Sequence, residues 1–240
     1  MEDNGEEIVP DFEILYEVGP VIAINKQAGL LTQAPAGIDS LESRIKDFLI
    51  RREHKPGGCY LGIPHRLDRP ASGVIVFAKH VRAANRLCEQ FRGRLVGKKY
   101  WALAEGNIPD DQGTWVDYMR KIPNRAEAEL IAPISPDARE AILHYHVKKR
   151  FGDCTWLEIE LETGRTHQIR LQCSSRGFPL LGDGLYGSQR AFGEQFEDDR
   201  LRAIALHSRE MTFTHPQTRE PVCLVAPLSS AWHAAGIEEE

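Results

Sequence analysis

The stretch that decides the fold is a polar run leading into an apolar one: His65-Arg66-Leu67-Asp68-Arg69-Pro70-Ala71-Ser72-Gly73, then Val74-Ile75-Val76-Phe77-Ala78. The prolines and the glycine favour a loop, whereas the five apolar residues predict a buried, central strand. Arginines on both sides of Asp68 favour its charged form, which makes it available as a nucleophile or a base. A turn aspartate that pairs with an arginine is an alternative that fits this segment as well.

Hydrophobic periodicity outward from this run predicts strands with a few helices between them. Two strands are expected within 14–25, around Gly19-Pro20, and a helix begins after Asp39 or Ser40. Further helices are expected at 81–95 and at roughly 166–176, and strands at 100–105, 141–149, 157–162, 211–213 and 222–226. Residues 107–136 carry weak signals, typical of short strands or turns. This order indicates an α+β fold with a largely antiparallel, mixed sheet.

Composition limits the class of protein. The chain has 240 residues, 42% hydrophobic and 27% charged, which is ordinary for a globular protein of one large or two small domains. It has no run of about 18 apolar residues, so we expect no transmembrane helix. Its acidic start is unlike a secretory signal. The five cysteines are widely spaced and form no Cys-x-x-Cys pair, which argues against a disulfide framework and indicates a reducing, cytoplasmic location.

The net charge of -5 is unevenly distributed along the chain. Residues 1–20 hold seven acids and no lysine or arginine, and the chain ends in Glu238-Glu239-Glu240. Without those ten acids, 25 acids face 30 lysines and arginines, so the body is basic. We therefore expect solvated acidic tails at 1–13 and 231–240, around one domain at 14–230. The basic run from Arg82 to Lys99 predicts a phosphate-facing patch, or else an ordinary solvated helix face.

Two further polar clusters follow the first. In Lys98-Lys99-Tyr100-Trp101-Ala102-Leu103-Ala104-Glu105-Gly106, a strand tyrosine could stack on a base, or it could be an ordinary core tyrosine. In Gly164-Arg165-Thr166-His167-Gln168-Ile169-Arg170, two arginines gather at a helix start, where anions bind readily. The alternative for this second cluster is a purely structural helix N-terminus.

Together these clusters resemble the RluA-type family of RNA pseudouridine synthases. Residues 65–79 match its His-Arg-Leu-Asp signature with the apolar strand and Ala-Lys, and 98–106 match its Lys-x-Tyr-x-Ala element. Residues 163–170 match its Thr-Gly-Arg-x-His-Gln-Ile-Arg run, and 182–187 its Gly-Asp-x-x-Tyr-Gly loop. The resemblance spans about 14–227 and implies a pseudouridine synthase fold with a central catalytic cleft.

The resemblance also implies a mechanism and a set of site residues. Asp68 would act on the ribose or base of a flipped-out uridine, Arg170 would pair with it, and Tyr100 would stack on the base and help remove the C5 proton. The implied RNA-binding residues are His65, Arg66, Arg69, Lys98, Arg165 and His167. No metal or cofactor is implied. The expected partner is a structured stem-loop of ribosomal or transfer RNA, and the expected state is a monomer without a membrane anchor.

The chain departs from the family pattern at two places. Gln27 stands where the family usually has proline after Lys26, and Pro70-Ala71 replaces a commoner polar pair. Ala71 lacks a hydroxyl that could orient Asp68. The chain before residue 14 is also too short for the small RNA-binding S4 domain of many relatives, so we expect target choice to rest on the catalytic domain or on partners.

Three alternatives make different demands on the residues. A glycosidic hydrolase needs a second acid, for which Asp183 or Asp153 would have to serve. A metal site could use His144 and His146, with His65 or His207, but shows no evident third ligand nearby. An RNA-binding protein without activity should have a damaged aspartate, tyrosine or arginine, whereas Asp68, Tyr100 and Arg170 are all present.

Overall fold

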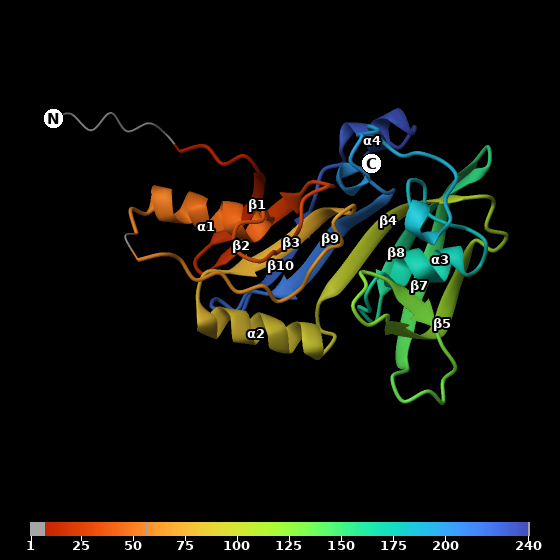
Figure 1. Cartoon of the computed structure of the whole chain (residues 1–240). Helices are drawn as coiled ribbons and strands as arrows, with labels where there is room; N and C mark the ends of the chain where they lie inside the picture. Colours follow the sequence, from red (N-terminus) through yellow and green to blue (C-terminus); the bar gives the residue numbers. More distant parts are fainter. Residues whose placement is uncertain (1–7, 56, 240) are drawn as a thin grey trace.

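The computed structural model describes residues 8–55 and 57–239, and in this part ten strands join one sheet (Figure 1). The strands are β1 (Glu13–Val18), β2 (Val21–Lys26), β3 (Ser72–Ala78), β4 (Gly97–Glu105), β5 (Gln112–Lys121), β6 (Ala128–Leu130), β7 (Arg139–Phe151), β8 (Cys154–Leu161), β9 (Leu206–Thr214) and β10 (Pro221–Val225). Their order is β1-β2-β3-β9-β4-β8-β7-β5-β6, with β10 also on β9. Only the β3–β9 pair is parallel among these strands, which confirms the mostly antiparallel α+β prediction.

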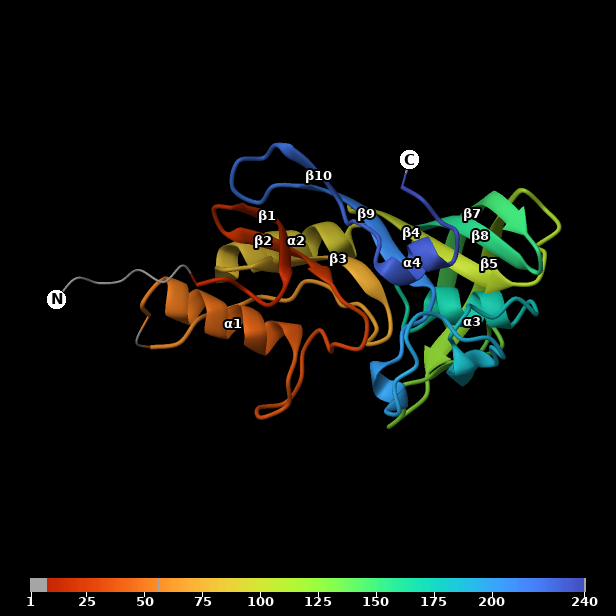
Figure 2. The ribbon, with the colours of Figure 1, turned by 90° about the horizontal axis from the view of Figure 1, so that it is seen from above.

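The helices divide between the two faces of the sheet. They are α1 (Leu41–Arg52), α2 (Val81–Arg92), α3 (Gln168–Ser174) and α4 (Ser230–Ala234). Because strand residues alternate, Ile75 and Tyr100 face the core under α1 and α3, whereas Val76 and Trp101 face α2 and α4. Figure 2 shows α1 and α3 on the same side of the sheet. None of these helices is long and apolar enough to cross a membrane.

Most predicted elements are confirmed, with instructive exceptions. Ser40 caps α1 through a capping box with Ser43, and β1 and β2 flank Gly19-Pro20. Helix α2 ends at Arg92, because Arg94 has a left-handed backbone, and Leu95 is therefore 72% exposed. Helix α3 starts only at Gln168, since His167 is also left-handed.

Strand β5 is long, although only short elements were expected between residues 107 and 136. It pairs along its length with β7. Trp115 and Met119 are buried, and Asp117 on the same face accepts a hydrogen bond from Gln172 of α3 at 2.7 Å. A half-buried carboxylate on the inner face of a strand breaks the apolar alternation that would have revealed the strand.

The expected tails are wrong in their extent. Residues 1–7 and 240 lie outside the described residues. Phe12, however, packs edge-on against Phe48 with ring centroids 5.6 Å apart. At the other end Trp232 and Ile237 are fully buried beneath the sheet, and the Glu239 carboxylate accepts the Leu228 N–H. A few large apolar side chains therefore dock both segments despite the acids around them.

Candidate active site

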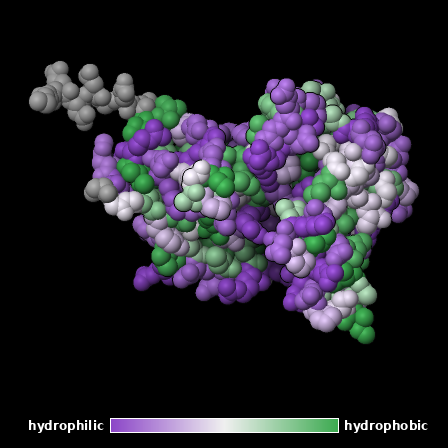
Figure 3. Space-filling view, viewed as in Figure 1, coloured by the Kyte–Doolittle hydropathy of each residue, from purple (hydrophilic) through white to green (hydrophobic). Residues whose placement is uncertain are grey.

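A cleft of about 1050 Å³ opens on the sheet face that carries α1 and α3. Figure 3 shows the hollow between the two halves of the molecule, with hydrophilic residues along its walls. One wall comes from the loop at 63–70 and the end of α2, and the other from 161–167 and α3. The two halves of the sheet meet between these walls, where Tyr100 of β4 lies.

Asp68 lies in this cleft on a loop that is fixed from below by Lys26. The Lys26 ammonium is fully buried and donates to the backbone carbonyls of Gln27, Leu30, Arg69 and Ala71, at 2.8–3.2 Å. Thr32 adds a reciprocal pair of hydrogen bonds to the backbone of Leu67. Backbone on both sides of Asp68 is therefore held in place, and the orienting hydroxyl that Ala71 lacks is not needed for this support.

Two partners approach the same oxygen of Asp68. Arg170 Nη1 donates to Oδ2 at 3.2 Å, and His167 Nε2 lies 3.7 Å from it. Asp68 Oδ1 has no hydrogen-bond partner among residues 8–55 and 57–239, and the side chain is 27% exposed. One carboxylate oxygen of Asp68 is thus held, and the other has no hydrogen bond within the described part of the chain.

Arg170 is held chiefly by a residue that sequence reasoning did not assign to it. Its Nε and Nη2 donate to the two carboxylate oxygens of Asp183, at 2.6 and 2.8 Å. Asp183 is 1% exposed and precedes a 3₁₀ turn at Gly184–Tyr186. This bidentate pair fixes the plane of the guanidinium. The available signal was the Gly-Asp-x-x-Tyr-Gly loop, which we noted without giving Asp183 a role in it.

Tyr100 forms part of the cleft wall, as its place in a strand predicted. Burial raises the pKa of Tyr100 to about 12, and a hydrogen bond with Ser208 offsets part of this rise. The hydroxyl is therefore protonated at neutral pH. In this state Tyr100 can stack on a base and donate or accept a hydrogen bond, but it is a weak base by itself.

His65 and Arg69 lie in the cleft but are committed to the protein itself. His65 Nε2 accepts the Val76 N–H at 3.0 Å, and its ring stacks on Phe91. Burial lowers the pKa of His65 to about 3, so it is neutral and brings no charge to a phosphate. Arg69 Nε donates to Gly29 O at 2.8 Å. These contacts occupy Nε2 of His65, which still lines the cleft, so a contact of His65 with the RNA backbone stays a prediction.

The remaining predicted cations lie at the mouth of the cleft, together with others that we had not assigned. We call Lys26, Asp68, Arg170 and Asp183 the cleft floor. The cleft rim consists of Arg66, Arg92, Arg94, Lys98, Lys121 and Arg165, all of which line the opening. Across the whole cleft eight lysines and arginines accompany two acids, Asp68 and Glu162.

The cleft rim is poorly paired within the protein. Arg66, Arg92, Lys98 and Lys121 make no side-chain hydrogen bond or ion pair in the described part of the chain, and Arg94 reaches Glu162 only at 3.8 Å. Burial and the nearby Arg94 lower the pKa of Lys98. Burial, then Arg94 and Arg139, also lower the pKa of Arg165. Like charges gathered in this way are stabilised by an anion from outside.

Three of the four histidines weighed as metal ligands, His65, His144 and His207, make other contacts. His144 Nε2 lies 2.7 Å from Glu162 Oε1 and Nδ1 lies 2.8 Å from the Thr114 hydroxyl. His207 is buried between Ser72 and the carbonyl of Ala226. Within residues 8–55 and 57–239, no group of three or more His, Cys, Asp or Glu side chains is arranged to hold a metal ion.

Comparison with known proteins gives a consistent result. Residues 20–175 match the family model described as RNA pseudouridylate synthase. The chain is 33% identical over 223 residues to an uncharacterized RNA pseudouridine synthase of Synechocystis, covering 90% of this chain and 65% of that protein. It is 33% identical over 215 residues to the ribosomal large subunit pseudouridine synthase C of Buchnera aphidicola, covering 90% and 66%. The chain thus spans just under two thirds of the length of these relatives.

A solved structure, human RNA pseudouridylate synthase domain containing 4, superposes with a TM-score of 0.75 at 22% identity, covering 95% of this chain and 94% of that one. This likeness concerns the fold alone, and it agrees with a pseudouridine synthase fold of the α+β class. From the family model and the relatives together, the chain belongs to the RNA pseudouridine synthase family, within its RluA-type branch.

Proposed function

We propose that this protein isomerises specific uridines in RNA to pseudouridine, with Asp68 acting on a flipped-out uridine. In this reaction the N1–C1′ bond breaks, the base turns, and a C5–C1′ bond forms, while C5 loses a proton and N1 gains one. The observation that carries the proposal is the meeting of Asp68, Tyr100 and Arg170 in one cleft with a cationic rim.

The floor suits an aspartate that acts on a sugar or a base. Arg170 holds Oδ2 and leaves Oδ1 toward the opening, where a uridine would enter. Tyr100 offers a ring on which the base can stack and a protonated hydroxyl that can orient it. Removal of the C5 proton by Tyr100 then requires that its hydroxyl first lose its own proton.

The rim suits a polyanion. A flipped uridine leaves its stack at a cost of a few kcal/mol, which contacts to the neighbouring phosphates must offset. Arg66 is exposed, unpaired among the described residues and two positions from Asp68, so it is placed to fill the space that the base vacates. Lys98, Arg165 and the other rim cations would hold the backbone on both sides.

A glycosidic hydrolase is less well supported. Its second carboxylate would have to be free to act on water. Both oxygens of Asp183 are bound to Arg170, and Asp153 is an exposed partner of Arg190 that does not line the cleft. Neither acid proposed for that role can therefore serve it.

We further infer that the substrate is a structured stem-loop of ribosomal or transfer RNA, and that the enzyme works as a monomer in the cytoplasm. All residues of the proposed site come from one chain. All five cysteines are free, which fits a reducing compartment. Pseudouridine mapping in RNA from a deletion strain and sedimentation of the purified protein test these two inferences.

The central test follows tritium release from RNA labelled at uridine C5. We expect release by the unmodified chain and none by Asp68→Asn, while Asp153→Asn, an exposed acid outside the cleft, retains it. Thermal melting checks that both variants fold. Release that survives Asp68→Asn would overturn the role of Asp68, and no release from any ribosomal or transfer RNA fraction would favour RNA binding without catalysis.

A further inference from the structure

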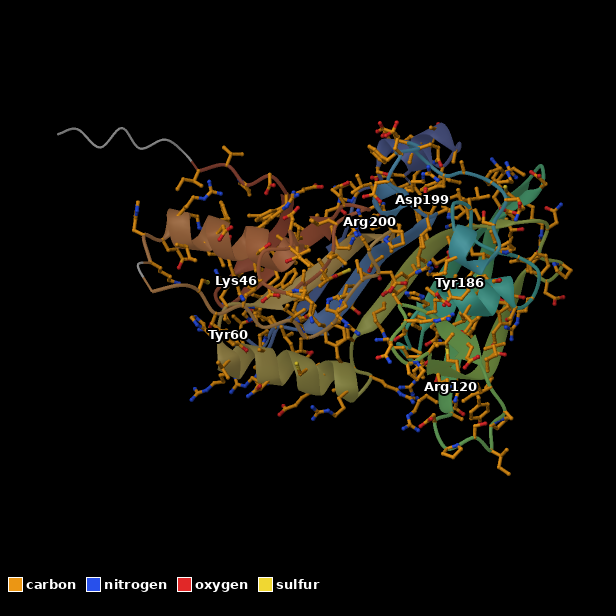
Figure 4. The ribbon with its side chains drawn as sticks, viewed as in Figure 1. Lys46, Tyr60, Arg120, Tyr186, Asp199 and Arg200 are labelled. Atoms are coloured by element: carbon orange, nitrogen blue, oxygen red, sulfur yellow. The ribbon has the colours of Figure 1, made fainter. Side chains whose placement is uncertain are left out.

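Beneath the floor, a tyrosine contacts both groups that approach Asp68. The Tyr186 hydroxyl lies 3.0 Å from His167 Nδ1, and His167 Nε2 lies 3.7 Å from Asp68 Oδ2. The Arg170 guanidinium lies over the Tyr186 ring, 5.1 Å from its centroid. Figure 4 shows Tyr186 in the half of the molecule that carries α3. Tyr186 thus contacts both side chains that approach Oδ2 of Asp68, of which Arg170 donates a hydrogen bond to it.

The hydrogen bonds among Tyr186, His167 and Asp68 indicate which nitrogen of the His167 ring carries the proton. A neutral imidazole carries one proton, and a lone pair on Nε2 would face the Asp68 carboxylate and be repelled by it. The proton therefore belongs on Nε2. Nδ1 is then an acceptor, and the Tyr186 hydroxyl donates to it at 3.0 Å rather than to Ala128 O at 3.3 Å. Burial lowers the pKa of His167, which keeps the ring neutral.

The backbone of His167 is also unusual. Its φ of 54° lies in the left-handed region, which a histidine rarely occupies without support. The support comes from Gln168, whose side-chain oxygen accepts the Arg165 N–H at 3.0 Å and the Thr163 hydroxyl at 2.8 Å. This turn directs the His167 ring toward Asp68 and Tyr186.

Tyr186 also contacts the edge strand β6, which lies beside the cleft wall. Its hydroxyl oxygen accepts the N–H of Ala128, the first residue of β6, at 2.9 Å. The turn between β5 and β6 places Lys121 and Ala126 in the cleft lining. A group that contacts this turn can therefore act on Asp68 through Tyr186 and His167.

We propose that His167 and Tyr186 are positioning residues that fix Oδ2 of Asp68 and couple its orientation to the β5–β6 turn. The 3.7 Å separation is too long for a hydrogen bond, and closing it by under 1 Å when uridine enters would make one. His167 is thereby assigned to the aspartate and not to the RNA backbone. The kinetic consequences of this inference rest on the proposed function.

Three substitutions separate positioning from simple structural support. Tyr186→Phe keeps the ring over Arg170 and removes the hydroxyl, and we expect kcat to fall about tenfold with KM for RNA unchanged within twofold. His167→Gln keeps a donor that can reach Asp68. His167→Asn suits the left-handed backbone better but is too short to reach. We expect His167→Gln to retain a higher kcat than His167→Asn. A purely structural role predicts the reverse order, and it also predicts a change in KM or in the melting temperature of these variants.

Coupling is tested by combining the changes. Once His167→Asn has removed the intermediary, adding Tyr186→Phe should lower kcat no further. If kcat of the double variant falls by the product of the two single losses, the two residues act independently, and the proposed coupling is wrong.

One measurement does not depend on catalysis. Nitrogen NMR of imidazole-labelled protein at pH 7.5, with the His167 signal identified by its loss in His167→Asn, should show the proton on Nε2. Tyr186→Phe should shift the population toward Nδ1. A proton on Nδ1 in the unmodified chain would overturn the inference. If the tautomer is as expected but no tritium is released from RNA, the proposed function fails while the geometry assigned here holds.

Discussion

The floor and the rim of the cleft each contain a lysine, fully buried in the floor and half-buried in the rim, and the surroundings of the two differ. Lys26 donates to four backbone carbonyls, whereas Lys98 has no side-chain hydrogen bond or ion pair within the described residues. The floor satisfies its charges internally, so it is rigid before any ligand arrives. The rim leaves its charges to be satisfied by a ligand. The difference separates residues that set the geometry of Asp68 from residues that would recruit RNA.

We expect the largest loss of stability when the Asp183 carboxylate is removed from the cleft floor. Asp183→Asn leaves the buried Arg170 facing an amide in place of a carboxylate, and loss of one partner from a buried pair costs about 3–5 kcal/mol of unfolding free energy. Urea unfolding measures the loss. Asp153→Asn removes an exposed partner of Arg190 and should cost about 0–1 kcal/mol. Equal losses in the two variants would mean that the floor is not held by this pair.

The two lysines can be compared directly by the same substitution. Lys26→Met removes the donor of the Gln27, Leu30 and Ala71 carbonyls, whereas Arg69 O keeps the Gly29 N–H, and we expect about 3 kcal/mol of lost stability. Lys98→Met should change stability by about 0.5 kcal/mol or less, while lowering the salt dependence of RNA binding by about 0.7 in the logarithmic slope. Urea unfolding and RNA titrations at several salt concentrations measure these effects. A stable Lys26→Met or an unchanged salt slope in Lys98→Met would remove the distinction between floor and rim.

The family resemblance named Asp68, Tyr100 and Arg170 because each stands in a short run that matches a family motif, and all three line one cleft. Apolar patterns also predicted β3 and β8, whereas the long strand β5 was not predicted. Support at a distance was harder to see. The Arg170–Asp183 pair joins a helix to a turn 13 residues on, and nothing in the composition of either segment marks the pair as buried.

Residue type misled where the surroundings decide the role. The family resemblance implied that His65 contacts RNA, but it gave no sign that His65 Nε2 accepts a backbone N–H of β3. Lys26 received no role, because a lysine in a loop gives no sign that four carbonyls surround it. Acidic residues near both ends suggested tails, although Phe12, Trp232 and Ile237 are enough to dock those segments.

His65 lies in the cleft wall, but its contacts are internal, like those of the cleft floor. We therefore expect its protonation to lower the stability of the protein as pH falls. Burial lowers its pKa to about 3, so below the unfolded value of about 6.5 the unfolded chain binds a proton that the folded chain refuses. The neutral His65 ring therefore makes its full contribution to the unfolding free energy above about pH 6.5. This contribution falls by about 1.4 kcal/mol for each pH unit as pH decreases from there toward 3. His65→Gln keeps an acceptor for Val76 N–H and should flatten the slope between pH 6.5 and 5.

The control for this prediction is His80→Gln, at an exposed position before α2, which should leave the slope as it is. Unfolding free energies from urea titrations at several pH values provide the measurement. His207, whose pKa burial lowers to about 4, contributes a similar loss in every variant and so cancels in the comparison. If His65→Gln leaves the dependence of the unfolding free energy on pH unchanged, protonation of the His65 ring does not destabilise the folded protein.

The smallest effect should come from a rim arginine whose backbone is strained. Arg94 has φ of 58°, and Arg219, exposed in the turn before β10, has φ of 68°. Glycine at either position relieves the left-handed backbone, and we expect a gain of at most about 1 kcal/mol in both variants. Only Arg94 lines the cleft, so Arg94→Gly should also weaken RNA binding and lower its salt slope, while Arg219→Gly should not. Strain kept at Arg94 despite this cost fits a residue selected to place its charge at the rim. If the two variants bind RNA equally, the Arg94 charge contributes nothing to RNA binding, and Arg94 does not belong to the functional part of the cleft rim.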